Sequence, residues 1–427
     1  MIDIEPSVEE YAEVSGTEGP IRDIQHDDWL VPDGEPLNTV ATYLFEEIEA
    51  AHPRPKKQRR DATQRRRDMV ANIVANVALL TAHHPEGSRL MVSAGNLRST
   101  RYDRPLFSRK AFVEVIEVLE NLKYLHREKG KRGGLRTTIE PTDALRWLLP
   151  PAGSSLPLAR LPGAETIVLK GGAGRNKPKV LLDYEDNAET MAMRSEMETI
   201  NTILNATTIT LDGQVQPPVH MVRMFQVENA SSPPEFSLHG RLYGGFWEHL
   251  PKAKRHLIQI DGHQVAELDF SGMFVQLAYA EAGLPPPDGD PYEGLESLPR
   301  DAAKIATSAL LCKSGPMKRL PPHLRAMLDD GWTGRLVTQS LVHRHPGIAH
   351  LFGQSTGLRL MHTESRVAVA ALLDLAAQGI PALPIHDALL VAKPQADQCR
   401  AAMQAASARI LGRHLPIRRK DNFPPMP

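Results

Sequence analysis

The chain is poor in cysteine and has no long apolar run. Its 427 residues include two cysteines, Cys312 and Cys399, which are too few for a disulfide framework or a zinc cluster. No apolar stretch reaches the roughly 18 residues that a membrane-spanning helix needs. The acidic N-terminus lacks the basic and apolar regions of a secretory signal. These absences predict a protein of the reducing cytoplasm that does not engage a membrane.

Charge is distributed unevenly, although the net charge is only −1. Residues 1–50 hold fourteen Asp or Glu and one Arg, which leaves 49 basic and 37 acidic residues, a balance of +12, in the remainder. A basic excess of this kind in residues 51–427 is suited to binding phosphate groups. A solubilising acidic tail on a mildly basic enzyme explains the same pattern. The length and the 41% hydrophobic content fit two or three globular domains.

The first 150 residues predict an acidic arm followed by a small DNA-binding domain. We expect residues 1–53 to form a partly disordered arm with one short amphipathic helix at Leu37–Ala51. Residues 54–150 form the next predicted domain. It begins with the stretch 54–67, which carries eight basic residues against one Asp and leads into a helical apolar pattern.

Within residues 54–150, the order of elements is typical of a winged helix. Arg89–Val92 fits a short strand, and Ser108 is suited to N-cap a helix that runs to about Tyr124. The basic, glycine-rich segment HREKGKRGG follows, and a β-like run starts at Leu135. In a winged helix the helix enters the major groove and the hairpin touches phosphates, although the same module also docks proteins. We therefore expect duplex DNA to be contacted by Arg109, Lys110, Lys129, Lys131 and Arg132.

Residues 151–185 predict a linker, because PPAGSS, LPG and KGGAGRNKP are rich in turn-forming residues. This linker leaves room for one hairpin. A polar amphipathic helix is expected from Asp186 to Asn205. Residues 186–427 would form the catalytic core, and its last ten residues, RRKDNFPPMP, fit a C-terminal tail.

Two aspartates stand where predicted strands end. The segment HQVAELDFSG alternates polar and apolar residues, and the spacing becomes helical from Met273, which places Asp269 at a strand-to-helix junction. Asp387 follows His386 between two apolar runs, which predicts the apex of a tight β-hairpin. An Asp beside buried strands needs a partner or a metal. Two such acids on adjacent strands would hold two Mg²⁺ or Mn²⁺ ions about 4 Å apart, as in-line phosphoryl transfer requires.

Four segments in the second half of the chain carry a recognisable pattern of residues. They are HGRLYGGFWEHLPKAKRHL from His239, LDFSG with Asp269, RDAAKIATSALLC from Arg300, and IHDALL with Asp387. Together they resemble the upstream element and motifs A, B and C of family A DNA polymerases and of the single-subunit, phage- and mitochondrial-type RNA polymerases. The resemblance implies an α+β fold, a right-hand palm with reduced fingers and a helical thumb, joined to the N-terminal winged-helix domain.

The resemblance also implies roles for single residues. Asp269 and Asp387 would be the metal ligands, and Arg300 and Lys304 would complete the catalytic set. Spacing by four positions places the basic pair on one helical face with two further residues. The implied nucleotide-binding residues are Arg300, Lys304, Ser308, Cys312 and Phe274. The implied nucleic-acid contacts are Arg241, on the primer-template minor groove, with Arg255 and His386.

Several positions depart from the family pattern and leave the sugar of the nucleotide open. Phe274 stands where the DNA polymerases carry a Glu and the RNA polymerases a small residue. Its bulk favours a steric gate against ribonucleotides. Ser308 and Cys312 replace the aromatic residue and the Tyr of motif B. Ala388 follows the second Asp, where DNA polymerases tend to have Glu and RNA polymerases Ser.

We therefore expect a template-directed nucleic-acid polymerase, foremost a family A-like DNA polymerase, for replication or repair of DNA such as that of a mobile element. It should lack proofreading, because no acidic cluster typical of an exonuclease is present. Its partners would be primer-template and duplex DNA and nucleoside triphosphates. A primase or small RNA polymerase is the alternative on the same scaffold. A catalytically inactive DNA-binding replication or regulatory protein is the alternative of another class, and the oligomeric state stays open.

Overall fold

The computed structural model describes residues 23–52, 60–84, 86–92, 100–105, 107–130, 136–151, 154, 156–172, 179–295 and 298–420. Residues 1–22 and residue 53 of the predicted acidic arm, together with Lys131 and Arg132 of the predicted basic hairpin, lie outside these residues. The described chain divides into two compact units. The smaller unit takes residues up to 165 together with 208–218, and the larger unit takes residues 166–207 and those from 219 onward.

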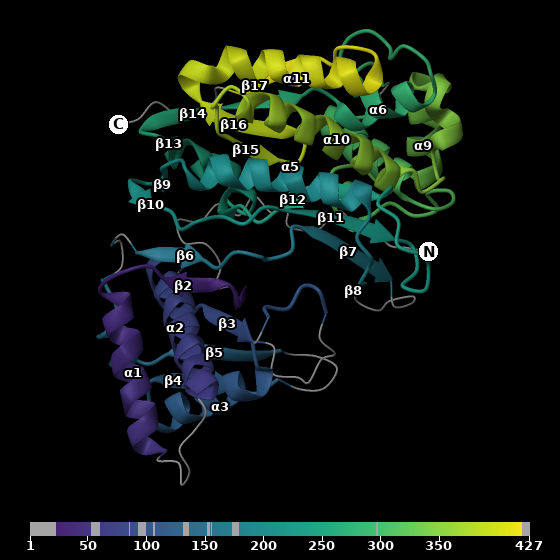
Figure 1. The fold of residues 1–427 in the computed structure, drawn as a ribbon. Helices are drawn as coiled ribbons and strands as arrows, with labels where there is room; N and C mark the ends of the chain where they lie inside the picture. The colour runs from purple at the N-terminus through teal and green to yellow at the C-terminus, as the bar shows by residue number, and fades with distance from the viewer. Residues whose placement is uncertain are drawn as a thin grey trace. The chain divides into compact units, whose positions relative to one another are not determined.

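The smaller unit packs helices against a four-stranded sheet with the strand order β1-β3-β5-β4 (Figure 1). Strands β3, β5 and β4 are antiparallel, and β1 joins β3 in parallel. Its helices are α1 (Leu37–Ala51), α2 (Arg60–His83), α3 (Arg109–Asn121) and α4 (Asp143–Arg146). Its strands are β1 (Asp23–Gln25), β2 (Leu30–Pro32), β3 (Arg89–Val92), β4 (Leu125–Glu128), β5 (Thr137–Pro141), β6 (Leu158–Arg160), β9 (Ile209–Leu211) and β10 (Gln214–Val215).

Local sequence signals account for the elements of this unit. Helix α1 and strand β3 have the predicted bounds, which confirms both predictions. The Ser108 side chain accepts a hydrogen bond from the backbone N–H of Ala111, so the predicted N-cap of α3 is also confirmed. The helix ends at Asn121 rather than at Tyr124, and Lys123 adopts a left-handed φ of 66°. Apolar residues of α1, α2 and α3 form one buried cluster with the sheet.

The stretch 151–185 contains three strands, so it is more structured than the predicted linker. Strand β6 pairs with β2, and β7 (Ile167–Gly172) pairs antiparallel with β8 (Lys179–Leu181), where the sequence left room for a hairpin. Strand β7 also pairs in parallel with β11 (Val222–Val227), far along the chain. The sequence did not reveal these strands for two reasons. Glycines and prolines surround their short apolar runs, and the strands with which they pair are distant in sequence.

The larger unit contains two sheets and the helices that pack on them. One sheet has the order β12-β11-β7-β8, and the other is built on β14. Its remaining strands are β12 (His239–Tyr243), β13 (Ile258–Ile260), β14 (His263–Phe270), β15 (Ala382–Ile385), β16 (Ala388–Ala392) and β17 (Ile417–Lys420). Its helices are α5 (Ala188–Asn205), α6 (Met273–Glu281), α7 (Arg300–Cys312), α8 (Pro322–Ala326), α9 (Gly334–Arg344), α10 (Gly357–Ala376) and α11 (Ala396–Leu411).

Strand β14 is the centre of the second sheet. It pairs with β16 along one edge, and β13 and β17 share the other edge. Residues 418–420, which we expected in a tail, therefore belong to a strand of the core. For residues 418–420 the tail prediction is wrong, because the short, strongly basic run of β17 pairs with β14 through its backbone, which a hydropathy pattern does not reveal. The other seven residues of the predicted tail lie outside the described residues.

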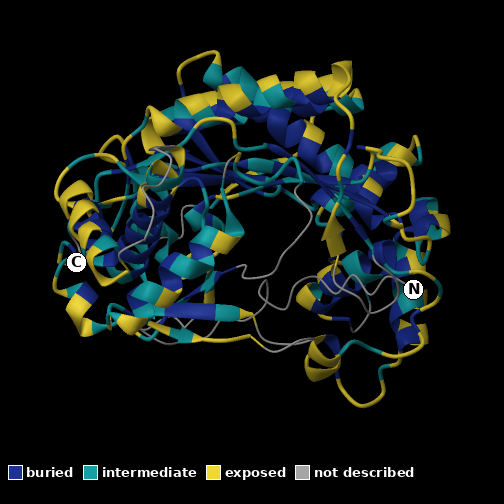
Figure 2. Cartoon of the chain, turned by 60° about the horizontal axis from the view of Figure 1, so that its bottom comes forward, coloured by how far each residue is buried: buried dark blue, intermediate teal, exposed yellow. Residues whose placement is uncertain are grey.

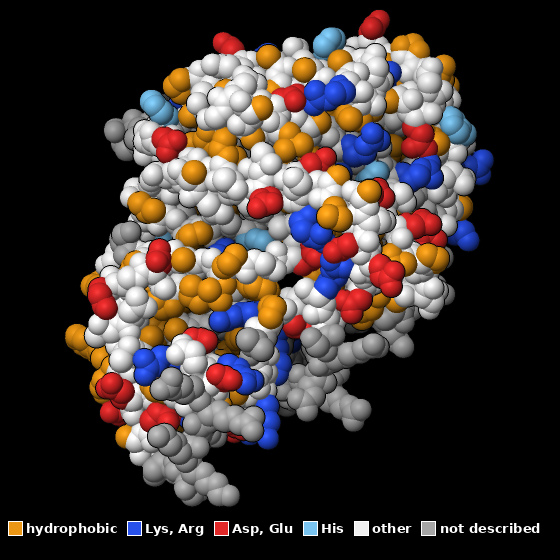
Figure 3. All heavy atoms as spheres, in the orientation of Figure 1, with side chains coloured by type: hydrophobic (Ala, Val, Ile, Leu, Met, Phe, Trp, Pro, Cys, Tyr) orange, Lys and Arg blue, Asp and Glu red, His pale blue; other side chains and the backbone are white. Residues whose placement is uncertain are grey.

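Helices α10 and α11 pack against each other and onto this sheet (Figure 1). Buried residues follow the inner sides of the helices and the sheets, while exposed residues follow the outer sides (Figure 2). On the face shown in Figure 3, basic and acidic side chains are interspersed. Among the described residues, no helix combines the length and the apolar character needed to cross a bilayer.

Candidate active site

Asp269 lies near the end of β14, at the point where the chain turns into α6. Ser271 and Gly272 form the turn, and Gly272 has φ 64°. A Cβ atom on Gly272 would lie 2.7 Å from Cγ of Pro291, so only glycine fits without a shift of that ring. The strand, the tight turn and the helix thus hold the Asp269 carboxylate in the wall of a cavity. The strand-to-helix position that the sequence predicts is confirmed.

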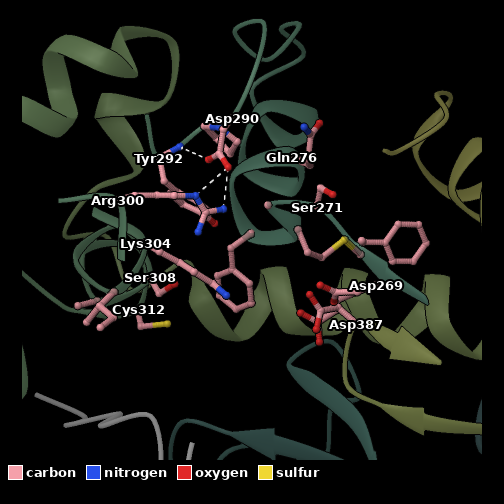
Figure 4. A pocket seen from close by; sticks show the side chains of 18 of the residues that line it. Asp269, Ser271, Gln276, Asp290, Tyr292, Arg300, Lys304, Ser308, Cys312 and Asp387 are labelled. Carbon is pink, nitrogen blue, oxygen red and sulfur yellow. Dashed lines mark hydrogen bonds and ion pairs between the residues drawn. The ribbon is translucent and has the colours of Figure 1, made fainter. Parts of the chain in front are cut away.

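Asp387 lies in the two-residue turn between β15 and β16, as predicted. Ile385 pairs with Ala388 across the hairpin, and His386 takes a left-handed φ of 53°. In the neighbouring ladder, Asp269 pairs with Ala388, which follows Asp387 directly. The two acids therefore lie at neighbouring ends of the adjacent strands β14 and β16, and their side chains lie beside each other at one wall of the cavity (Figure 4).

The Asp387 carboxyl is buried among other acids. Burial raises its pKa well above the usual range, and the nearby carboxylates of Asp269 and Glu364 raise it further. Glu364 on α10 is only 1% exposed, and it accepts hydrogen bonds of 2.7 and 3.0 Å from the Arg241 guanidinium. Asp269, Glu364 and Asp387 thus gather three acids at one part of the cavity wall, which makes that part suited to a bound cation.

A second acid of β14, Glu267, is held by two cations. Lys420 Nζ lies 3.0 Å from Glu267 Oε1, and Arg255 Nη1 lies 3.0 Å from Oε2. Burial alone would raise the pKa of Glu267, but Lys420 and Arg255 hold it below the usual value. Lys420 Nζ also lies 2.7 Å from Asp269 Oδ2. Sequence reasoning missed Lys420, because only the pairing of β17 with β14 brings it to the site.

Helix α7 forms the opposite wall of the cavity. The cavity has a volume of about 1000 Å³ and is lined by all four residues predicted to share one helical face, Arg300, Lys304, Ser308 and Cys312. Phe274 lines it as well. In Figure 4 the Lys304 side chain extends from α7 into the space before the two aspartates. The structure thus brings every predicted nucleotide-binding residue to the cavity that Asp269 and Asp387 line.

Arg300 has an acidic partner within the cavity. Its Nε and Nη2 atoms donate hydrogen bonds of 2.9 and 2.6 Å to Asp290 Oδ2. The Asp290 side chain also accepts from the backbone N–H of Tyr292. Burial would raise the pKa of Asp290, but the Tyr292 N–H and Arg300 lower it below its usual value. A phosphate group that reached Arg300 would therefore compete with a carboxylate already in place.

Other cations line the same cavity and were not predicted. Lys252, Arg319 and Arg418 contribute to the wall. Within the described ranges, neither these three cations nor Lys304 lies within ion-pair distance of a carboxylate. Arg418 is opposite Asp269 in the β14–β17 ladder, so its side chain leaves the same face of the sheet. One cavity therefore combines two adjacent carboxylates with several cations that are available to an anion.

The residues predicted to contact nucleic acid are partly engaged within the protein. Arg241 pairs with Glu364, and Arg255 pairs with Glu267. Burial, and to a smaller degree the nearby Arg241 guanidinium, lowers the pKa of His386 to about 3. The imidazole ring is therefore uncharged at pH 7.

In the smaller unit, Arg109 donates hydrogen bonds of 3.1 and 2.5 Å to the Asp28 carboxylate. Lys110 and Lys129 are exposed. Two of the predicted basic contacts of this unit are thus open to solvent, while Arg109 is held by an internal ion pair.

The carboxylates of Asp269 and Asp387 suit a divalent cation that takes few of its ligands from the protein. The ammonium group of Lys420 already forms an ion pair with Asp269. No group of three or more His, Cys, Asp or Glu that could hold a metal ion occurs in the part of the chain that the structure describes. Magnesium commonly takes one or two carboxylates from the protein and completes its shell with water and substrate phosphate. Asp269 and Asp387 meet that requirement.

Comparison with known proteins gives little beyond this geometry. No protein-family model matches the chain, and no curated protein matches it. Among solved structures the chain is similar to the POL domain of Pol1 from M. smegmatis in complex with DNA primer-template and dNTP. The TM-score is 0.28 and the sequence identity 12%, over 54% of this chain and 50% of that chain. The match thus spans half of the length of that domain.

Proposed function

We propose that this protein is a nucleic-acid polymerase that transfers nucleotides in the cavity between β14, β16 and α7. One observation carries the proposal. Two aspartates on adjacent strands face a helix whose basic and polar residues recur every four positions, and all of them line one cavity. A cavity with two carboxylates on one wall and basic residues on another suits a substrate that combines a divalent cation with a polyphosphate.

In the proposed reaction, the 3′-oxygen of a primer forms a bond to the α-phosphorus of a nucleoside triphosphate. The bond from that phosphorus to the bridging oxygen breaks, pyrophosphate leaves, and the hydroxyl proton passes to water. Lys304 and Arg300 would bind the leaving phosphates, with the unpredicted Arg418 beside them. Asp269 and Asp387 would hold two Mg²⁺ or Mn²⁺ ions, which when bound supply stabilisation of the attacking and leaving oxygens.

Phe274 supports a preference for deoxynucleotides. It lines the cavity, and the guanidinium of Arg241 lies 5.8 Å from its ring centre. A side chain fixed by such a contact can exclude a 2′-hydroxyl by its bulk. We therefore propose DNA synthesis first and keep an RNA-synthesising enzyme, a primase or small RNA polymerase, as the second candidate.

The test is extension of a labelled primer on a template, with dNTPs or rNTPs and Mg²⁺. Asp269→Asn and Asp387→Asn should each lower the rate by at least about a thousandfold, because each removes a charged ligand. Asp374→Asn is the matched control, since Asp374 pairs with Arg409 and does not line the cavity. Wild-type protein without extension activity on either nucleotide would favour an inactive, purely DNA-binding protein. Aspartate variants as active as the control would refute the assigned catalytic site.

We propose duplex DNA binding for the smaller unit. The antiparallel order β3-β5-β4, with α3 preceding β4 in the chain, is the order expected of a winged helix. Lys110 in the first turn of α3 and Lys129 after β4 are exposed cations in the places where such a module contacts phosphate. The ion pair of Arg109 with Asp28 makes that residue a support of α3 rather than a primary contact.

A further inference from the structure

The ammonium group of Lys420 contacts two carboxylates of strand β14. Its Nζ lies 2.7 Å from Asp269 Oδ2 and 3.0 Å from Glu267 Oε1. In the ladder Lys420 is opposite Glu267, and Asp269 is two residues further on β14. Opposed residues and residues two apart share one face of a sheet, and long side chains reach diagonal neighbours. Backbone pairing therefore places the ammonium group between two carboxylates.

Glu267 keeps Lys420 in this position. Its second carboxylate oxygen is bound by Arg255 at 3.0 Å, and the side chain is only 2% exposed. With both oxygens engaged and little space to turn, Glu267 holds the ammonium group next to Asp269. Lys420 thus has one firm partner, Glu267, and one partner, Asp269, which the proposed function assigns to a divalent cation.

The charges around Asp269 determine how its ion pair with Lys420 would affect a bound divalent cation. Three cations, Arg241, Arg255 and Lys420, form ion pairs with Glu364, Glu267 and Asp269, and in the described contacts Lys420 is the cation paired with Asp269. Without a divalent cation, Lys420 is the counter-charge of Asp269. A divalent cation on the same carboxylate would stand next to the ammonium group, and the two would repel each other strongly in a partly buried site.

We propose that Lys420 competes with the divalent cation for Asp269, so that cation binding there depends on the nucleotide. The inference rests on the proposed function. In the nucleotide-free protein, Lys420 occupies Asp269 and weakens binding of the cation. When a nucleoside triphosphate enters with its cation, the phosphate charges offset the repulsion, and Lys420 keeps its bond to Glu267 while it releases Asp269. Lys420 is in this sense a positioning residue that favours nucleotide-bound over free divalent ions.

The test measures binding of Mn²⁺ to the full chain by electron paramagnetic resonance of the free ion. The titration is made with and without a non-hydrolysable nucleoside triphosphate. Lys420→Met should bind Mn²⁺ about tenfold more tightly than the wild type without nucleotide, because its competitor is gone. With nucleotide bound, the two proteins should differ by less than about threefold. Lys420→Gln gives a second neutral variant should Lys420→Met fail to fold, which melting curves will show.

Two matched controls separate competition from a general loss of positive charge. Lys393→Met removes a lysine of the same sheet region, whose Nζ lies 2.7 Å from Gln264 Oε1, and should leave Mn²⁺ affinity unchanged. Arg418→Met removes a cation that lines the cavity without an ion pair to Asp269 in the described contacts. Its effect should be smaller than that of Lys420→Met. Lys420→Arg retains the charge and should stay near the wild type.

Equal Mn²⁺ affinity of Lys420→Met and the wild type would overturn the proposal, as would an equal gain in Arg418→Met. Asp269→Asn distinguishes this failure from failure of the proposed function. If Asp269→Asn loses Mn²⁺ binding while Lys420→Met behaves as the wild type, only the role of Lys420 is wrong. If Asp269→Asn binds Mn²⁺ like the wild type, the proposed metal site itself is wrong.

Discussion

Arg241 and Glu364 form an ion pair that is almost closed to solvent. Glu364 is 1% exposed and the Arg241 side chain 13%, and two hydrogen bonds join them. A buried pair of this kind contributes little net stability relative to apolar residues, but removal of one partner leaves an uncompensated charge. Arg241 therefore needs Glu364, whatever it contacts in a complex.

Glu364→Ala should destabilise the protein by about 3–5 kcal/mol, because it leaves the guanidinium of Arg241 buried and unpaired. Glu364→Gln keeps one hydrogen-bond acceptor for Arg241 and should cost clearly less. Denaturant unfolding of the two variants and the wild type measures the difference. Equal losses in the two variants would contradict an account based on the Arg241 contact.

Glu248 predicts a pH dependence of stability. Burial raises its pKa to about 7, although the backbone N–H groups of Gly245 and Gly244 oppose this. The folded state then holds the proton more tightly than the unfolded state. This stabilisation is complete below the ordinary pKa of 4.5 and is lost as the pH rises through about 7.

Glu248→Gln keeps the acceptor for the Gly245 N–H, whose bond to Glu248 Oε1 is 2.8 Å, and does not ionise. Its unfolding free energy should therefore fall less than that of the wild type between pH 5 and pH 8, by on the order of 2 kcal/mol. Unfolding by denaturant at several pH values gives the comparison. Parallel pH profiles for the variant and the wild type would refute the assignment.

At the scale of elements, helix α3 illustrates how local sequence sets a boundary. Phe112, Val115, Ile116 and Leu119 recur at helical spacing and are all buried, and Ser108 closes the N-terminus. Strand β17 is the opposite case. Its side chains are mostly polar and partly exposed, and its place is fixed by hydrogen bonding to β14.

Ser108→Ala removes the side-chain acceptor for the Ala111 N–H and should destabilise the smaller unit by about 1 kcal/mol. Ser108→Thr retains a hydroxyl and serves as the control, with a loss of a few tenths at most. Thermal unfolding followed by circular dichroism provides the measurement. A Thr variant as unstable as the Ala variant would show that the hydroxyl group is not what matters.

At the scale of the whole molecule, the chain carries two compact units with different proposed contacts. The cavity with Asp269 and Asp387 lies within the larger unit, and the exposed Lys110 and Lys129 belong to the smaller one. The two sets of residues should therefore affect binding independently of each other.

The double variant Lys110→Glu, Lys129→Glu should weaken binding to a short DNA duplex and lower the salt dependence by about two ion equivalents. Mn²⁺ binding should not change. Lys393→Glu is a control for a single charge reversal in the larger unit. Fluorescence anisotropy at several salt concentrations measures the effect, and unchanged duplex affinity in the double variant would favour a protein-docking role for the smaller unit.

Much of the candidate site could be predicted from the sequence, because its signals are local. The change from alternating to helical spacing locates Asp269, and the apolar runs on either side of His386-Asp387 locate the hairpin. A spacing of four residues places Arg300, Lys304, Ser308 and Cys312 on one face of α7. Each of these inferences uses only residues that are neighbours along the chain.

The tertiary structure alone decided which distant groups complete the site. Lys420 follows Asp269 by 151 positions, and only the antiparallel pairing of β17 with β14 brings its ammonium group to 2.7 Å from that carboxylate. The pairing of Arg241 with Glu364 likewise joins β12 to α10. Periodicity carries no information about such contacts, because the register between strands depends on packing across the whole unit. The sequence by itself therefore determined the two aspartates and the residues that share one face of α7, and the fold determined which cations pair with the acids of the site.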